Sequence, residues 1–234
     1  MQMRANPQVD LPDSASSGSR TGPNEWPFRS LLSAQEGRRV TLLHGTRVDD
    51  SILTTSVFLI LSGCIRCVMR PDDEHENIIA LMRPGNVVGF LAAIDELPPI
   101  HEYYSEGRCE LLTIPRATVK RLFAEDKDFA LHIAHVLCDR VRQSYSFVEQ
   151  YAVNPRRRLA RKLLMVMTSF GRQANGRYVL DLRLSQDNWA AMAGLTRQTV
   201  NKELGRLKSD GLIALENGKL IILDREAIKQ IAYH

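Results

Sequence analysis

The sequence predicts an α+β fold made of three parts in order: an antiparallel β-domain, a long helix, and a C-terminal domain of short helices and a β-hairpin. Three observations support this prediction. Short β-prone runs separated by turn residues fill residues 38–115. Apolar residues at coiled-coil spacing follow between residues 130 and 151. Near the C-terminus, two capped helical segments precede an Asn-Gly turn between β-prone runs.

Residues 1–27 are polar and rich in Ser, Pro and Gly, which predicts a flexible arm and not a secretory signal. The sequence contains no run of about 18 apolar residues, so no membrane span is expected. The four cysteines are scattered, which favours a reducing compartment over a disulfide framework. These features together predict a cytoplasmic protein.

The β-domain is expected to span residues 28–127. Its β-prone runs are followed by Gly, Pro, Ser or Asp residues that signal turns. The runs are residues 40–43, 56–61, 64–69, 77–82 and 109–114. Short strands at this regular spacing predict an antiparallel sandwich or barrel.

A long helix is expected over residues 128–153, with small and apolar residues spaced 4-3-4-3-4-3. The spaced residues are Ala130, Ala134, Leu137, Val141, Ser144, Val148 and Tyr151. This spacing is typical of the seam of a two-stranded coiled coil, so we expect a homodimer. A second stripe of Leu131, Cys138 and Tyr145 is expected to pack on the β-domain. The alternative is a helix buried within one subunit.

The C-terminal domain, expected over residues 154–234, contains two short helices joined by a tight turn. Ser185 and Thr196 are good N-caps for these helices, and Gly194 suits the turn because it can adopt a left-handed conformation. Val200 and Leu204 would bury one face of the second helix. Its remaining surface carries Arg197, Gln198, Asn201 and Lys202. These side chains can bind base edges and phosphates, although a helical hairpin with a polar solvent face is the alternative.

A β-hairpin is expected directly after the second helix. Runs 212–215 and 220–223 flank Asn217 and Gly218, a strong hairpin signal, and a helix-turn-helix followed by a hairpin is a winged helix-turn-helix. Residues 154–234 carry 15 Lys and Arg against 7 Asp and Glu, whereas residues 1–153 carry 16 against 20. Positive charge is therefore concentrated in this domain, as the binding of DNA phosphates requires.

The order of these parts resembles the cAMP receptor protein and fumarate–nitrate reductase regulator (Crp/Fnr) family of bacterial transcription factors. The resemblance rests on residues 58–63, 83–89, 158–164 and 184–207, and it extends from about residue 30 to the end. It implies a jelly-roll-like double-stranded β-helix as effector domain, a dimerisation helix, and a homodimer that binds a palindromic operator in double-stranded DNA. RNA polymerase would be a further partner of an activator, and no enzyme activity is implied.

The match to the family motif assigns DNA contacts residue by residue. Arg197, Gln198 and Lys202 occupy base-reading positions, while Thr196 and Thr199 are placed for phosphates. Asn201 and Ser185 belong to the same expected DNA-binding surface. Better-known members of the family carry Glu where this chain has Gln198. Because Gln suits adenine better than Glu does, we expect a different preferred half-site.

Family members that bind cyclic nucleotides are similar at a phosphate cassette, Gly-Glu-Leu followed about ten residues later by Arg-Ser or Arg-Thr. In this chain Gly89 is followed by Phe90 and Leu91, and Pro99 and Ile100 stand in the Arg-Ser slot. Both polar anchors of the nucleotide are therefore replaced by apolar groups, and the charge-assisted pair with the phosphate is lost. We expect no cyclic AMP binding in the usual mode.

Other sensor chemistries find little support in the sequence. No cysteine precedes Cys64, which excludes the N-terminal cysteine cluster of the family's oxygen sensors. Cys64 and Cys67 are interpreted as core residues. His132 and His135 are interpreted as solvated helix histidines, the alternative being a metal or haem site with Cys138. We therefore expect no metal, no cofactor and no catalytic set. Two possibilities stay open: a filled pocket, or a pocket that holds haem or a small apolar molecule and switches DNA affinity.

Overall fold

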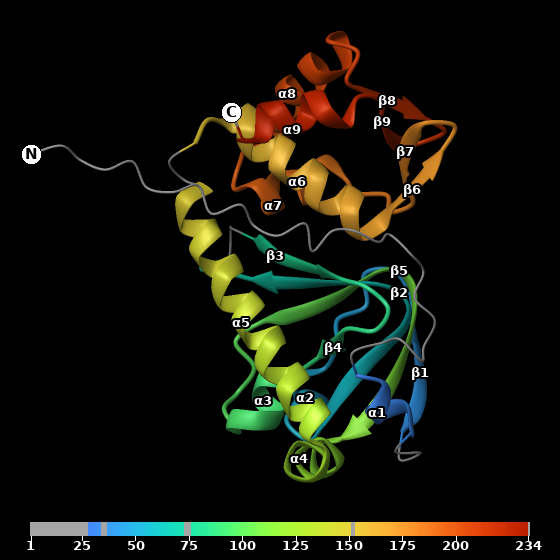
Figure 1. The fold of residues 1–234 in the computed structure, drawn as a ribbon, viewed down its shortest axis with the longest axis vertical. Helices are drawn as coiled ribbons and strands as arrows, with labels where there is room; N and C mark the ends of the chain where they lie inside the picture. Colours follow the sequence, from blue (N-terminus) through green and yellow to red (C-terminus); the bar gives the residue numbers. More distant parts are fainter. Residues whose placement is uncertain (1–27, 34–36, 73–75, 151–152, 234) are drawn as a thin grey trace, which may run out of the picture.

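The computed structural model describes residues 28–33, 37–72, 76–150 and 153–233. It confirms the α+β fold, with an antiparallel β-domain below and a helical C-terminal domain above in Figure 1. The elements up to the long helix are α1 (Arg29–Ser33), β1 (Arg38–Leu42), α2 (Asp50–Leu53), β2 (Ser56–Met69), β3 (Asn77–Met82), β4 (Val87–Val88), α3 (Phe90–Asp95), β5 (Glu102–Pro115), α4 (Arg116–Glu125) and α5 (Lys127–Gln150).

The β-domain is built on two long strands, β2 and β5, which pair with each other. The sheet order is β1-β5-β2-β3, and β4 pairs with β2, all antiparallel. Strand β2 joins two runs that the sequence predicts as separate strands, because the pairing with β5 continues through irregularities between Ile60 and Ser62 and between Ser62 and Cys64. Gly63 has φ 88°, and a Cβ there would lie 2.6 Å from the carbonyl oxygen of Arg108. A glycine is therefore required where the strand bends.

Two apolar clusters stabilise this domain. One lies among the strands and includes Ile60, Ile65 and Leu111. The other lies between the sheet and the helices α1, α3, α4 and α5, and its aromatic centre is Phe28, whose ring centroid is 5.8 Å from that of Phe90 and 5.9 Å from that of Phe129. Short helices α1, α3 and α4, which the sequence pattern does not predict, cover this side together with α5, whereas Leu53 of the unpredicted α2 packs in the cluster among the strands.

Helix α5 packs on the β-domain through a different stripe from the predicted one. Leu131 is 58% exposed and Cys138 is exposed, so their predicted packing on the β-domain is wrong. The buried stripe consists of Phe129 and Ile133, with Val136 and Leu137 packed against the same cluster. The helix begins where the Asp126 carboxylate accepts hydrogen bonds from the backbone N–H groups of Asp128 and Phe129. The inward stripe is set by the packing of Phe129 and Ile133 on the β-domain.

The predicted dimer seam is therefore divided between two faces of α5. Leu137 contacts the chain's own core, whereas Ala134, Val141 and Ser144 are exposed as predicted. The exposed apolar residues Leu131, Ala134, Cys138 and Val141 again have 3-4-3 spacing. The side chains of Tyr145 and Val148, and all of Tyr151, lie outside the described residues.

The C-terminal domain contains more structure than the sequence pattern predicts. Its elements are α6 (Pro155–Phe170), β6 (Gly171–Ala174), β7 (Arg177–Leu180), α7 (Gln186–Ala193), α8 (Arg197–Ser209), β8 (Ile213–Glu216), β9 (Lys219–Ile222) and α9 (Arg225–Tyr233). Asn154 caps α6 as predicted, and the β8–β9 hairpin forms at Asn217 and Gly218. The unpredicted β6–β7 hairpin turns at Asn175 and Gly176 and extends the sheet to the order β6-β7-β9-β8.

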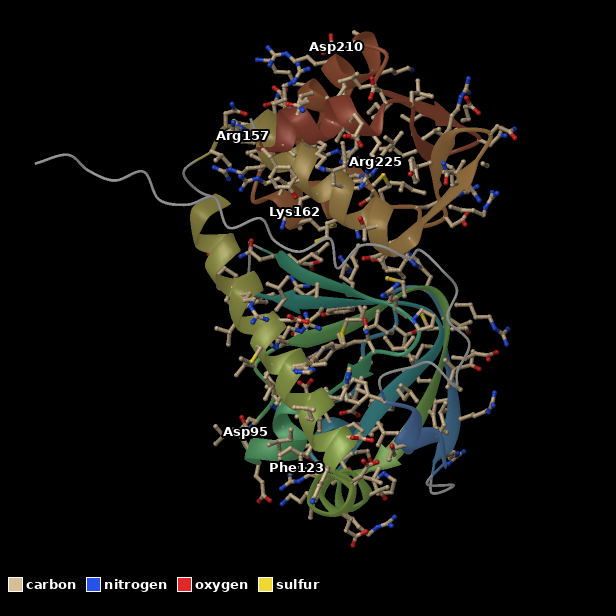
Figure 2. All side chains as sticks on the ribbon, in the orientation of Figure 1. Asp95, Phe123, Arg157, Lys162, Asp210 and Arg225 are labelled. Carbon is tan, nitrogen blue, oxygen red and sulfur yellow. The ribbon has the colours of Figure 1, made fainter. Side chains whose placement is uncertain are left out.

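Lys162 is buried on the side of α6 that faces the β-domain (Figure 2). Burial, and then the neighbouring Arg161 charge, lowers the pKa of its ammonium group to about 8 from 10.5. Because the folded pKa lies below the unfolded one, the free energy of unfolding should rise as the pH increases from about 8 to about 10.5.

We therefore expect Lys162→Met to raise the free energy of unfolding at pH 7 by roughly 2–3 kcal/mol. The advantage should be largely lost by about pH 10.5, where the amine is neutral in the folded state and half deprotonated in the unfolded state. Urea denaturation at the two pH values measures this, with the exposed Lys208→Met as control. A less stable Lys162→Met variant at pH 7 would contradict the prediction.

Candidate nucleic-acid interface

Helices α7 and α8 form the predicted helix-turn-helix, and their caps explain where each begins. The Ser185 hydroxyl accepts a hydrogen bond from the backbone N–H of Asn188, and the Thr196 hydroxyl accepts one from the backbone N–H of Thr199. Gly194 ends α7 in the left-handed conformation, with φ 60°. The predicted caps and turn are thus confirmed.

One face of α8 packs against the domain core. Val200 and Leu207 are fully buried, whereas Leu204, which the sequence places on the same face, is only half-buried. Glu203 is buried instead and forms an ion pair with Arg206 at 2.7 Å. Its second carboxylate oxygen has no hydrogen-bond partner among the described residues. The sequence pattern did not predict this buried carboxylate, because a Glu side chain is normally exposed to solvent.

The opposite face of α8 is exposed and polar. Its residues are Arg197, Gln198, Asn201 and Lys202. The Arg197 guanidinium lies 3.5 Å from the Asp187 carboxylate and donates a hydrogen bond to the Gln186 amide oxygen at 3.3 Å. Because both charged groups of this pair are largely exposed, the pair is weak and the guanidinium can leave it for a stronger partner.

The N-terminal ends of α7 and α8 lie next to each other, since Arg197 at the start of α8 contacts Gln186 and Asp187 at the start of α7. Free backbone N–H groups and the positive end of the helix dipole favour anions at such ends. The Thr196 and Thr199 hydroxyls are 2.9 Å apart on the same surface. Two helix ends and two hydroxyl groups thus lie on one surface, an arrangement that favours anions such as phosphate groups.

The start of α6 is tied to the helix-turn-helix by two arginines. Arg158 donates a hydrogen bond to the carbonyl oxygen of Gly194 at 3.0 Å, and Arg156 pairs with Asp210 at 2.5 Å. Figure 2 shows Arg157 beside them at the start of α6 and Asp210 at the end of α8. These contacts fix α8 at both ends, and the sequence reading did not identify them because the partners are 36 and 54 residues apart.

The β-domain contacts the helix-turn-helix through α7, which lies against β3 (Figure 1). Val68 and Ile78 are buried in the same apolar cluster as the C-terminal domain. The side-chain amide of Asn188 donates a hydrogen bond to the Glu106 carboxylate at 3.0 Å. That carboxylate also lies 3.0 Å from the Arg66 guanidinium. This docking leaves the polar face of α8 exposed.

The residues at the cassette positions do not fill the interior of the β-domain with apolar side chains, as the sequence had suggested. Phe90 is buried, but it packs against Phe28 on the helical side of the sheet. Ile100 is 70% exposed, Leu91 is exposed and Pro99 is half-buried, so none of them fills the interior. Gly89 is buried with φ 80° and begins α3. The expected gain of apolar bulk inside the barrel is therefore wrong.

A polar cluster that the sequence analysis missed lies near α5. Burial raises the pKa of the Cys67 thiol to about 11 against an opposing effect of the Arg140 charge. Burial and then Arg140 lower the pKa of His101, and burial raises that of Tyr103, which hydrogen-bonds Cys67. Arg140 thus approaches the Cys67–Tyr103 pair. The cassette comparison gives no sign of it, because Arg140 lies on α5, far along the chain from Gly89 and Ile100.

The described residues contain no group of three or more His, Cys, Asp or Glu that could hold a metal ion. Cys64 and Cys67 are buried core residues, as predicted. His132 is half-buried, and the Phe28 ring lies 5.1 Å from its ring centroid, which corrects the expectation of a solvent-facing side chain. His135 is exposed, as predicted. Over the residues that the structure describes, no helix has the length and apolar character needed to cross a membrane.

Two domain families match this chain. Residues 157–231 match the Crp-like helix-turn-helix domain, and residues 50–126 match the cyclic nucleotide-binding domain. The chain is 25% identical over 177 residues to a CRP-like cAMP-activated global transcriptional regulator of Mycobacterium tuberculosis, a match that covers 75% of this chain and 79% of the relative. It is 27% identical over 177 residues to a global nitrogen regulator of Synechocystis, covering 74% and 79%.

Solved structures share the fold across both domains. FixK2 from Bradyrhizobium japonicum is similar with a TM-score of 0.73 at 15% identity, covering 85% of this chain and 98% of that one. A CooA mutant from Carboxydothermus hydrogenoformans is similar with a TM-score of 0.69 at 20% identity, covering 86% and 90%. With a cyclic nucleotide-binding domain, a Crp-like helix-turn-helix and relatives that regulate transcription, the chain belongs to the Crp/Fnr family of DNA-binding transcription regulators.

Proposed function

We propose that this chain binds a palindromic DNA site as a homodimer and reads bases with Arg197, Gln198 and Lys202. The observation that best supports this proposal is the polar face of α8, which stays exposed while Val200, Glu203 and Leu207 on its opposite face are buried. An arginine, a glutamine and a lysine on one helix match the donor and acceptor groups of the major groove. Asn201 lies on the same face.

Phosphate contacts are assigned to the adjoining helix ends. Thr196 and Thr199 present hydroxyl groups at the start of α8, and Ser185 does so at the start of α7. Such contacts position a protein on the duplex without reading sequence, and they make its affinity depend strongly on salt. If this protein activates transcription, RNA polymerase would be a further partner.

The dimer contact is assigned to the exposed stripe of α5 formed by Leu131, Ala134, Cys138 and Val141. Large apolar side chains exposed along one line of a helix are costly in water, and a two-fold partner would cover them. Parallel dimer helices would place the two reading helices on one side of the assembly, at half-sites about one helical turn apart.

Selection from a random DNA pool tests this proposal directly. The full chain should enrich a two-fold symmetric sequence whose half-sites are centred about 10 base pairs apart. A preference for adenine at the position read by Gln198 is expected. Two outcomes would contradict the proposal: enrichment of asymmetric sequences only, or no enrichment of any sequence beyond non-specific binding to phosphates.

We further propose that cyclic AMP does not control this protein, in contrast to the relative that is named for cAMP activation. Phe90 replaces the ribose-binding Glu of the family cassette, and Pro99 and Ile100 replace its phosphate-binding Arg-Ser pair. The expected result is that millimolar cyclic AMP gives no saturable heat in titration calorimetry and leaves operator affinity unchanged. Micromolar binding would contradict this. The variants Arg83→Ala, Arg108→Ala and Arg140→Ala would then test which arginine binds the phosphate, since Arg83 and Arg108 are exposed and the Arg140 charge acts on Cys67.

A second candidate function is a regulator whose effector acts through the contact between the two domains. The Asn188–Glu106 hydrogen bond and the shared apolar cluster favour it, because a change in the β-domain would reach α7 directly. A small apolar molecule or haem is the expected class of effector. The absorption spectrum of the purified protein tests for haem.

Redox control through the buried thiols is disfavoured, because burial raises the pKa values of Cys67 and Cys109 and keeps both protonated.

A further inference from the structure

Helix α5 exposes a wider apolar face than a two-helix seam needs. Measured from the stripe that is buried on the β-domain, Ala134 and Val141 lie roughly a quarter of a turn around the helix, and Leu131 and Cys138 roughly half a turn. One partner helix beside α5 covers a single narrow stripe. Leu131 is 58% exposed and Cys138 is exposed, so this second stripe needs a cover of its own.

Two-fold symmetry decides what stands opposite the second stripe. When two parallel helices lie side by side, a two-fold axis between them places their β-domains on opposite sides of the helix pair. The face of each helix that points away from its own β-domain then points to the side on which the partner's β-domain lies. Leu131 and Cys138, half a turn from their own β-domain, are therefore directed towards the partner's β-domain.

The two flanks of α5 show which part of the β-domain lies next to the seam. The flank opposite Ala134 and Val141 carries His132, whose ring centroid lies 5.1 Å from that of Phe28, the residue before α1. Figure 1 shows α1 on one side of α5 and α3 on the other. The flank of Ala134 and Val141 therefore faces the side of α3. The connection from α3 to β5, residues 96–101, follows on this side.

This connection is held in place where it leaves α3. Glu96 forms an ion pair with Arg116 of α4 at 2.9 Å. The backbone N–H of Leu97 donates a hydrogen bond to the Asp95 carboxylate at 3.1 Å. Two consecutive prolines follow and restrict the backbone further. A segment restrained in this way loses little conformational entropy when a partner covers it.

Two large apolar side chains of the connection are exposed, Leu97 at 63% and Ile100 at 70%. Burial and then the Arg140 charge lower the pKa of the neighbouring His101, so the end of the connection lies level with Arg140 in the middle of α5. Its start lies beside α4, next to the beginning of α5. In a parallel dimer Ile100 therefore stands at about the height of the partner's Cys138, and Leu97 stands nearer the start of the partner's α5.

We propose that residues 97–100 of each chain form a dimerisation arm that packs on Leu131 and Cys138 of a second copy of this chain. The contact presupposes the homodimer proposed above and adds the β-domain to its helix seam. It would cover apolar surface that is otherwise exposed on both elements. Ile100, which stands in the cassette slot of the phosphate-binding Arg-Ser pair, would then serve assembly instead of nucleotide binding.

A disulfide between the arm and α5 tests the contact. In Ile100→Cys, mild oxidation should join the introduced thiol to the native Cys138 of the partner and give a covalent dimer on a non-reducing gel. The covalent dimer should disappear on reduction, and also when Cys138→Ser is added. Leu43→Cys, at a side chain that is 66% exposed after β1, is the matched control and should give no more covalent dimer than the wild-type chain. Equal yields from Ile100→Cys and Leu43→Cys, or a covalent dimer that survives Cys138→Ser, would overturn the proposal.

Leu97→Glu combined with Ile100→Glu tests what the arm contributes to assembly. Carboxylates buried against the partner lose their solvation, so the dimer dissociation constant in sedimentation equilibrium should rise by about tenfold or more. Both side chains are exposed within one chain, so the fold should not change, and Leu43→Glu should leave the constant at its wild-type value.

The same measurement separates the arm from the helix seam. If replacing Leu131 and Val141 by glutamate dissociates the dimer while the Leu97 and Ile100 double variant keeps the wild-type constant, the arm is overturned and the seam stands. If the wild-type chain is itself monomeric, the homodimer falls and the arm falls with it.

Discussion

Replacing Leu131 and Val141 together by glutamate is expected to convert the proposed dimer into a monomer and to abolish operator binding. The two side chains are 58% and 51% exposed, and across a two-fold axis each would face its counterpart or a neighbour on the partner helix. Four carboxylates in one narrow seam would repel one another and lose solvation, at a cost of several kcal/mol. Sedimentation equilibrium measures the first effect and fluorescence anisotropy with labelled operator the second.

Leu137→Ala is the control that distinguishes the two faces of α5. Leu137 packs against the apolar cluster of its own β-domain. We therefore expect the variant to lower the free energy of unfolding by about 1–3 kcal/mol, because the side chain is only partly buried, and to remain dimeric. Dissociation of this variant, combined with an intact dimer in the glutamate double variant, would show that the seam lies on the Leu137 face.

The local features of the C-terminal domain could be predicted from the sequence because a few adjacent residues determine them. Ser185 and Thr196 bond to amides three residues away, and Gly194 adopts its φ within a single turn. The β8–β9 hairpin at Asn217 follows the same rule. Such features need no knowledge of the rest of the chain. The polar face of α8 could be predicted for the same reason.

The features that sequence analysis missed depend on partners far apart in the chain. The heptad spacing of α5 has two adjacent apolar stripes, and only the contacts of Phe129 and Ile133 with the sheet decide which stripe faces inward. Phe90 stands in the cassette position, but its packing on Phe28 turns it to the helical side. Arg140 approaches Cys67 because α5 crosses the sheet there. Residue spacing predicts faces of an element and not the surface that each face meets.

The contact between the domains shows the same limit. Asn188 has two roles. Its backbone N–H donates the capping hydrogen bond to Ser185, and its side-chain amide donates a hydrogen bond to Glu106 of the β-domain. The sequence identifies the first role and gives no sign of the second, which joins residues 82 positions apart. Because the capped end of α7 also lies beside Arg197, this one residue links the β-domain to the surface proposed for DNA.

Arg197→Ala is expected to cost about 1–3 kcal/mol of operator binding and to relax the sequence preference at one position of each half-site. The residue stands at the first position of α8, where an exposed guanidinium can form two hydrogen bonds with a guanine in the major groove. Lys208→Ala, in the last turn of the same helix, removes an equal charge and should weaken all DNA sequences alike. Binding-site selection with each variant measures both effects.

Gln198→Glu completes the test, because it changes hydrogen bonding at the neighbouring position without changing side-chain size. A carboxylate accepts hydrogen bonds but cannot donate them, so the preferred base should shift from adenine towards cytosine. The variant should select a different half-site while its dimerisation and melting temperature stay unchanged, since Gln198 is exposed and buries no surface. If Arg197→Ala and Gln198→Glu both select the wild-type site with wild-type affinity, α8 does not read the bases, and the DNA-binding surface must lie on another element of the domain.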